Sequence, residues 1–179
     1  NSADIKGTQL VFCDLSTPKK PYSEYVYGKD FDAYNDLKHK LVERGIPENE
    51  IAFIHDANTD KAKQDLFDKV TAGTIRVLIG STEKCGAGTN VQERLVAIHH
   101  LDAPYRPRDL IQRDGRGIRQ GNRNKIIRIY TYAEERTFDS YSYQILETKQ
   151  RFISQVEKGD MTVREADDID EATLSYAEI

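Results

Sequence analysis

Apolar residues gather into five short runs along the chain, and the segments between them carry apolar residues at every third or fourth position. The runs cover residues 9–15, 50–55, 76–80, 97–101 and 125–132. Short apolar runs bounded by turn-forming residues are typical of buried strands, whereas the wider spacing is typical of helices that bury one face. The alternation of strand and helix predicts an α/β fold, with a mostly parallel central sheet and helices on both faces in three layers.

Three helices are expected from their apolar stripes. The stripes consist of Phe31, Tyr34, Leu37 and Leu41; of Ala62, Leu66, Phe67 and Val70; and of Phe138, Tyr141, Ile145, Phe152 and Val156. Asn58 or Thr59 is expected to cap the second helix and Thr137 the third, because these side chains accept hydrogen bonds from the free N–H groups of a helix start. Gly73 is expected to end the second helix. The third is expected to pack across the sheet and to end near Gly159.

Length and composition limit the classes of protein to which this chain can belong. With 179 residues, 38% of them hydrophobic and 31% charged, the chain fits a single globular domain that we expect to be cytoplasmic and monomeric. We assign residues 9–159 to this domain, residues 1–8 to a linker or an expression remnant, and residues 160–179 to an acidic exit segment. No apolar run approaches the length of a bilayer crossing, so no membrane partner is expected.

Cysteine and histidine usage predicts no metal site. Cys13 and Cys85 lie far apart in the sequence, in a strand-like and a loop-like context, which favours free thiols in a reduced compartment. His99 and His100 are neighbours on one predicted strand, and the alternation of side chains sends them to opposite faces. A metal shared by the two histidines is therefore not expected.

The charge distribution is uneven around a net charge of -4. Between Arg106 and Arg128 the chain carries eight basic residues against only Asp109 and Asp114, whereas acids prevail from Glu157 onward. A local basic block favours a phosphate-bearing partner, while the overall acidity disfavours unspecific electrostatic binding to nucleic acid.

The basic block contains the stretch LDAPYRPRDLIQRDGRGIRQGN, residues 101–122. Gln112, Arg116 and Arg119 are spaced four and then three positions apart, which places their side chains on one face of a predicted helix. Two planar guanidinium groups on one face match the oxygens of a γ-phosphate. A solvated arginine-rich helix explains the same spacing, and the spacing alone favours that reading. Gly115 and Gly117 weaken the helix, and close approach of the backbone to a ligand is one explanation for them.

Two of the predicted strands end in segments suited to phosphate binding. Ser16, Thr17 and Lys19 follow the first strand, and the run STEKCGAGTN, residues 81–90, follows the third. Small hydroxyls, a lysine and glycines at the carboxyl ends of parallel strands are typical of ligand sites in α/β sheets. A helix expected to begin near Asn90 would add its positive end. Ordinary strand-ending turns remain the alternative, above all for the first strand.

These motifs together resemble the second motor lobe of superfamily two helicases, and within them the Swi/Snf-type group. The pattern of that group is D-x-P-x-x-P followed by Q-x-x-G-R-x-x-R-x-G-Q, and it fits from Asp102 to Gly121. The loop pattern S-T-x-x-x-G-x-G-x-N fits from Ser81 to Asn90. Arg106 stands where the group has asparagine, and Asn122 where it has glutamine. The segments IAFIHDAN and GRGIRQGN resemble more narrowly a subgroup in large bacterial mobile-element or phage proteins that carry an adenine-specific DNA methyltransferase.

The resemblance implies a RecA-like lobe and assigns roles to individual residues. Arg116 and Arg119 become arginine fingers that meet ATP held by the other lobe, and Gln112 couples nucleotide to nucleic acid. Gly86, Gly88 and Asn90 face the nucleotide. The residues implied at the nucleic acid are Ser16, Thr17, Lys19, Ser81, Thr82, Lys84 and Arg106.

Neither a G-x-x-x-x-G-K-[ST] phosphate loop nor a D-E-x-[DH] run after a strand occurs in the sequence. The sequence therefore predicts the second lobe of an ATP-dependent DNA helicase or translocase. ATP and Mg²⁺ would be held mainly by the first lobe of the same full-length protein, and the chain alone would hydrolyse no ATP. A stand-alone nucleic-acid-binding domain is the alternative. A Rossmann-type enzyme is disfavoured because Ser-Thr-Pro, and no G-x-G-x-x-G, follows the first strand.

Overall fold

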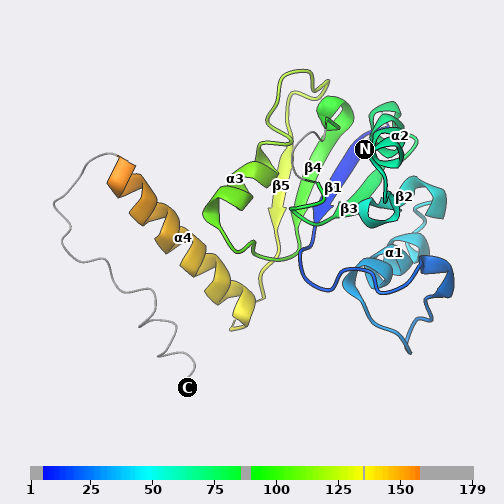
Figure 1. Ribbon diagram of the computed structural model, residues 1–179, viewed down its shortest axis with the longest axis horizontal. Coiled ribbons are helices and arrows are strands. Elements are labelled where there is room, and N and C mark those ends of the chain that lie inside the picture. Colours follow the sequence, from blue (N-terminus) through cyan, green and yellow to red (C-terminus); the bar gives the residue numbers. More distant parts are fainter. Residues whose placement is uncertain (1–5, 86–89, 135, 158–179) are drawn as a thin grey trace.

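The computed structural model describes residues 6–85, 90–134 and 136–157 (Figure 1). Its centre is a five-stranded sheet in the order β2-β3-β1-β4-β5, in which every neighbouring pair is parallel. The strands are β1 (Thr8–Phe12), β2 (Ile51–Phe53), β3 (Val77–Gly80), β4 (Leu95–His100) and β5 (Arg128–Thr131). The predicted α/β fold with a parallel sheet is confirmed.

The helices lie on both faces of the sheet. They are α1 (Ala33–Glu43), α2 (Asp60–Ala72), α3 (Pro107–Asp114) and α4 (Phe138–Glu157). Leu10 and Phe12 of β1 belong to the core cluster that contains Val70 of α2, whereas Val11 belongs to the cluster that contains Tyr34 of α1. Alternate side chains of the central strand thus enter two separate cores, which explains why β1 appears in the sequence as a continuous apolar run.

The starts of the first two helices follow the local chemistry of their caps. The Thr59 Oγ1 atom accepts a hydrogen bond from the Ala62 N–H group at 3.1 Å, and Gly73 ends α2 in the left-handed conformation with φ of 78°. Both features were expected. The expected place of Phe31 in the first helix is wrong, because Asp32 caps α1 and leaves Phe31 before the helix with 69% of its surface exposed.

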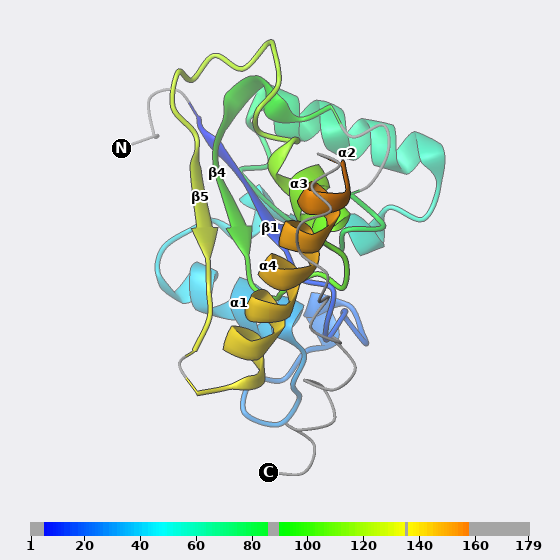
Figure 2. The same cartoon turned by 90° about the vertical axis from the view of Figure 1, so that its left-hand side faces the viewer.

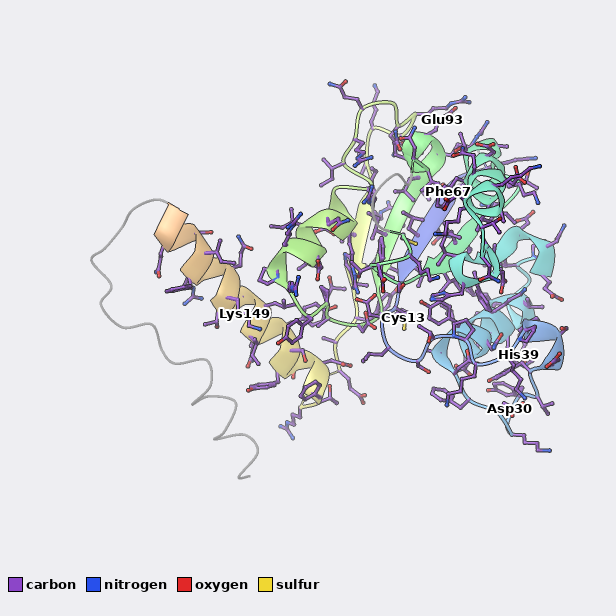
Figure 3. All side chains as sticks on the ribbon, in the orientation of Figure 1. Cys13, Asp30, His39, Phe67, Glu93 and Lys149 are labelled. Atoms are coloured by element: carbon purple, nitrogen blue, oxygen red, sulfur yellow. The ribbon has the colours of Figure 1, made fainter. Side chains whose placement is uncertain are left out.

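The long helix α4 packs against α3 and lies outside the sheet (Figures 1 and 2). Its Leu146 side chain is buried, whereas Phe152 is 47% exposed. The Lys149 ammonium group of α4 stands 4.9 Å from the centre of the Tyr105 ring, just before α3 (Figure 3). The expectation that this helix crosses the sheet is therefore wrong, since α3 occupies the position between them.

Two further expectations about local structure are wrong. The segment after Asn90 forms only a 3-10 turn, Gln92–Arg94, so no α-helix presents its positive end there. The first strand ends at Phe12, before the predicted limit. The N–H groups of Asp14 and Leu15 donate to the Asp102 carboxylate at 2.5 and 2.8 Å, and so they make no hydrogen bonds to a neighbouring strand. Within the residues the structure describes, no helix has the length and apolar composition needed to cross a bilayer.

Candidate functional site

Three loops meet at the carboxyl edge of the sheet, after β1, β3 and β4. The Asp102 carboxylate follows β4 and holds the loop after β1. Its Oδ2 atom accepts hydrogen bonds from the N–H groups of Asp14 and Leu15. The Asp14 carboxylate, which follows β1, holds the β3 exit in the same way. Its Oδ1 atom accepts the Thr82 N–H group at 2.6 Å, and its Oδ2 atom accepts the Thr82 hydroxyl at 2.8 Å. Parallel strands bring these loops together even though their residues are distant in the sequence.

Arg113 of α3 occupies the centre of this edge and is 1% exposed. Its Nε atom donates to Thr82 Oγ1 at 2.7 Å, and Nη1 donates to the Asp102 carbonyl at 2.8 Å. Nη2 donates to Asp14 Oδ2 at 2.8 Å and to Asp102 Oδ1 at 3.1 Å. The guanidinium group also lies 5.3 Å from the centre of the Phe12 ring. A buried charge is tolerated when its donors are satisfied and its counter-charges are close, and Arg113 meets both conditions.

A second polar pair extends this arrangement along α3. His100 is fully buried, and its Nε2 atom lies 2.8 Å from Asp114 Oδ1. Its Nδ1 atom lies 3.5 Å from Arg113 Nη1. Because Arg113 can only donate, this contact favours the tautomer that carries the proton on Nε2. As expected, His99 points to the opposite face, where it contacts Tyr132. We refer to Asp14, Thr82, His100, Asp102 and Arg113 as the Arg113 network.

A groove of about 580 Å³ opens beside the Arg113 network, and Asp14 and Thr82 of the network line it. Five of the predicted site residues line it: Thr17, Ser81, Thr82, Lys84 and Gln112. Asp14, His55, Glu83 and Asp109 complete the lining. We call this cavity the strand-exit groove. Residues predicted from three separate motifs thus share one cavity.

Several predicted hydroxyls are already engaged within the protein. Thr82 donates to Asp14 and accepts from Arg113, as described above. Ser81 Oγ accepts the Lys84 N–H group at 3.2 Å, and Ser16 Oγ accepts the Ala33 N–H group at the start of α1 at 3.0 Å. Lys19 and Arg106 are exposed and lie outside the lining of the groove. The nucleic-acid roles of all these residues remain predictions.

The predicted single helical face for Gln112, Arg116 and Arg119 is wrong. Helix α3 ends at Asp114, and both arginines follow it in successive turns. After α3 the chain packs closely against the sheet at Gly117, where an added Cβ atom would lie 3.0 Å from Ile98 Cδ1. This glycine lets the backbone pack against β4, and so its close approach is to the sheet and not to a ligand.

Arg116 is also buried, but its surroundings differ from those of Arg113. It is 5% exposed, and burial together with the charge of Arg119 lowers its pKa. The Cys85 side chain after β3 also acts on it electrostatically. Among the described residues, no carboxylate lies within 4.0 Å of the guanidinium nitrogens of Arg116 or Arg119. Arg113 is thus internally paired, whereas Arg116 is buried beside a second positive charge.

The remaining site predictions have mixed outcomes. Gly86 and Gly88 lie outside the described residues, and Asn90 is exposed. No sequence motif pointed to His55, whose buried Nδ1 atom has no partner among the described residues and which lines the groove. Burial and the nearby Lys84 charge lower the pKa of His55, so this imidazole is neutral at pH 7.

Neither cysteine fits the role of a nucleophile. Cys13 and Cys85 are both buried, and neither forms a disulfide. Burial is the largest cause that raises the pKa of each thiol to about 12, which keeps both protonated. No group of three or more histidine, cysteine or acidic side chains in the described part of the chain is arranged to hold a metal ion.

The family model of the helicase conserved C-terminal domain matches residues 10–121, from β1 to the turns that carry Arg116 and Arg119. The chain belongs to this family. The matched segment includes the Arg113 network and the strand-exit groove, so the site lies within the part that defines a helicase C-terminal domain. Such domains are lobes of ATP-dependent helicases.

Known proteins resemble this helicase C-terminal domain in sequence or in fold. Defense against restriction protein B of Escherichia phage P1 is 31% identical over 103 residues, which are 56% of this chain and 5% of that protein. The C-terminal part of the Fun30 ATPase domain has a TM-score of 0.55 at 18% identity, over 79% of this chain and 40% of that one. The Dbp5 C-terminal domain of S. cerevisiae, solved with Gle1 and IP6, has a TM-score of 0.54 at 19% identity, over 86% and 80%. The two structures share the RecA-like fold of this chain.

Proposed function

We propose that this chain is the second RecA-like lobe of an ATP-dependent DNA helicase or translocase of the Swi/Snf type, and that Arg116 and Arg119 complete the ATP site of the first lobe. The observation that carries the proposal is the buried Arg116 guanidinium, which has a second arginine beside it and no carboxylate among the described residues. A buried cation without a counter-charge is unfavourable. A phosphate group from a facing lobe would supply that counter-charge.

The chemistry of the two arginines suits phosphoryl transfer. A guanidinium group donates two parallel hydrogen bonds to phosphate oxygens and stays charged at any working pH. An arginine finger stabilises the negative charge on a transferring γ-phosphate. Its presence raises the rate of turnover by about 10³- to 10⁵-fold. ATP brings the phosphoryl group, and Mg²⁺ neutralises part of its charge. Both would be held mainly by the first lobe, so the chain alone should hydrolyse no ATP.

The strand-exit groove is the proposed DNA track. Thr17, Lys84 and Gln112 offer a hydroxyl, an ammonium group and an amide toward one cavity at the carboxyl edge of the sheet. Contacts of this kind position a phosphate backbone without reading its sequence. The proposed partners are therefore DNA and the first lobe of the same full-length protein, and a methyltransferase module in that protein is part of the same proposal.

The alternative is a stand-alone nucleic-acid-binding domain, and the charges of the groove disfavour it. Its lining carries the three carboxylates of Asp14, Glu83 and Asp109 against one lysine. Tight, partner-independent binding usually rests on several neutralised phosphates. We expect the chain alone to bind DNA weakly, and tight binding by the isolated chain at physiological salt would favour the alternative.

The proposal is tested in the protein that carries both lobes. We expect Arg116→Ala to lower DNA-stimulated ATP hydrolysis by about 10³-fold or more, with ATP affinity changed by less than about threefold. Hydrolysis is followed by phosphate release, and ATP affinity by titration with a fluorescent analogue.

The matched control is Arg123→Ala. Arg123 belongs to the same basic block but is exposed and paired with Glu93, so its loss should leave turnover within about twofold of the wild type. Wild-type turnover in the Arg116→Ala protein would contradict the finger role.

A further inference from the structure

The strand-exit groove contains a carboxylate where a phosphate backbone is proposed to lie. The Asp14 side chain is 31% exposed and lines the groove between the exits of β1 and β3. An uncompensated negative charge at this position would repel DNA over several ångströms. Some other group must therefore reduce the effect of this charge if the groove is to accept phosphate.

Arg113 is the group that faces Asp14 from behind the groove. Its Nη2 atom bonds Asp14 Oδ2 at 2.8 Å, and its Nε atom bonds the Thr82 hydroxyl that is itself bound to Asp14. Arg113 is buried and does not line the groove, whereas its neighbour Gln112 does. Helix α3 thus presents the Gln112 amide to the groove, while the neighbouring Arg113 offers its positive charge to Asp14 in the wall of the groove.

We propose that Arg113 is a positioning residue for DNA: it neutralises Asp14 in the wall of the groove, so that a phosphate backbone can approach Thr17, Ser81 and Lys84. This inference rests on the proposed function, because it takes the groove as the DNA track. Arg113 acts through Asp14 and Thr82 and has no contact with DNA of its own.

A purely architectural role for Arg113 makes a different prediction. If the residue only stabilises the fold, removal of Asp14 and removal of Arg113 should each weaken DNA binding, and the combined variant should bind no better than the weaker of the two single variants, because both changes remove the same contact. If Arg113 acts by compensating Asp14, removal of the carboxylate should make the arginine dispensable for DNA binding. Asp14→Asn is suited to this test because the amide oxygen can still accept the Thr82 N–H group.

The experiment measures binding of fluorescently labelled single-stranded and duplex DNA to the full 179-residue chain by anisotropy at low salt. The variants are Asp14→Asn, Arg113→Met and the combination of both. We expect Arg113→Met to weaken binding about tenfold, and Asp14→Asn to bind as tightly as the wild type or more tightly. The combined variant should bind within about threefold of the wild type.

The control is Arg123→Met, which removes one positive charge from the exposed Arg123–Glu93 pair outside the groove lining and should change affinity less than about threefold. Circular dichroism of each variant establishes that it is folded at the assay temperature. Asp14→Asn keeps the test decisive if Arg113→Met unfolds, because weaker DNA binding by Asp14→Asn would overturn the inference.

The outcomes separate this inference from the proposed function. Wild-type chain that binds no DNA at low salt would overturn the DNA track and the inference with it. Normal wild-type binding together with unchanged affinity in Arg113→Met would overturn the inference alone. A combined variant that binds DNA no better than Arg113→Met would likewise assign Arg113 an architectural role only.

Discussion

The Nη2 atom of Arg113 lies 2.8 Å from the Oδ2 atom of Asp14, although 99 residues separate the two in the sequence. The contact joins the exit of the central strand to α3, the helix that precedes Arg116 and Arg119. It closes the carboxyl edge of the sheet and fixes α3, which carries Gln112 to the groove. Within residues 101–122, Arg113 makes the arginine ion pairs that the structure describes, whereas no carboxylate among the described residues lies within 4.0 Å of the Arg116 guanidinium.

The first prediction concerns the stability contributed by Arg113. Arg113→Ala leaves the carboxylates of Asp14 and Asp102 without their guanidinium partner, and Asp102 is 4% exposed. Breaking a buried pair on one side costs about 3–5 kcal/mol, so the free energy of unfolding should fall by that amount in urea titrations. Arg123→Ala, at an exposed ion pair, should cost less than about 1 kcal/mol. Equal losses in the two variants would show that burial of the pair is irrelevant.

The layout of the fold could be predicted from the sequence because it depends on local chemistry. Strands buried on both faces appear as apolar runs, and the Thr59 cap and Gly73 mark the ends of α2 in the sequence itself. The position of α4 could not be predicted in this way. Its apolar stripe indicated the wrong face, because Phe138 and Phe152 are exposed and Leu146 is buried, and α3 takes the place that the sheet was expected to occupy.

The candidate site was predictable in part for a related reason. Ser81, Thr82 and Lys84 follow a strand directly, and the parallel sheet brings them to the groove that Thr17 also lines. Arg113 and Arg116 stand in the same basic run and look alike in the sequence. Only the position of Asp14, 99 residues earlier, decides which of the two is internally paired.

A second prediction follows from the close packing of Gly117. A Cβ atom there would lie 3.0 Å from Ile98 Cδ1 and 3.3 Å from Leu95 Cδ2, so Gly117→Ala should lower the free energy of unfolding by about 1–3 kcal/mol. The neighbouring Ile118 is exposed, and Ile118→Ala should cost less than about 0.5 kcal/mol. Urea titrations of both variants provide the test. A neutral Gly117→Ala would favour a ligand-contact role for this glycine over a packing role.

A third prediction concerns acid stability and His99. Burial lowers the pKa of His99, and the neighbouring His100 lowers it further. The unfolded chain, whose imidazoles titrate near an ordinary pKa of about 6.5, therefore takes up the proton before the folded chain does. The free energy of unfolding should fall as the pH drops from about 7 to 5, because the unfolded state binds more protons in this window.

His99→Phe isolates the contribution of His99 to this pH dependence. The substitution removes the titrating group and keeps an aromatic ring beside Tyr130, whose ring centre lies 5.0 Å from that of His99. The slope of unfolding free energy against pH should become smaller between pH 7 and 5. His55, whose pKa is also lowered, would account for part of the slope that remains. An unchanged slope in the His99→Phe protein would contradict the assignment.

The last prediction tests the docking of α4 on α3. Leu146 is 4% exposed and lies beside Leu110 and Ile111 at a shallow groove between the two helices. Leu146→Ala should therefore lower the free energy of unfolding by about 2 kcal/mol, at the low end for a buried leucine because the site is open on one side. Phe152→Ala removes a larger but half-exposed side chain of the same helix and should cost less. If Phe152→Ala proved the more damaging in urea titrations, the face of α4 that packs on the domain would be the one predicted from its aromatic stripe.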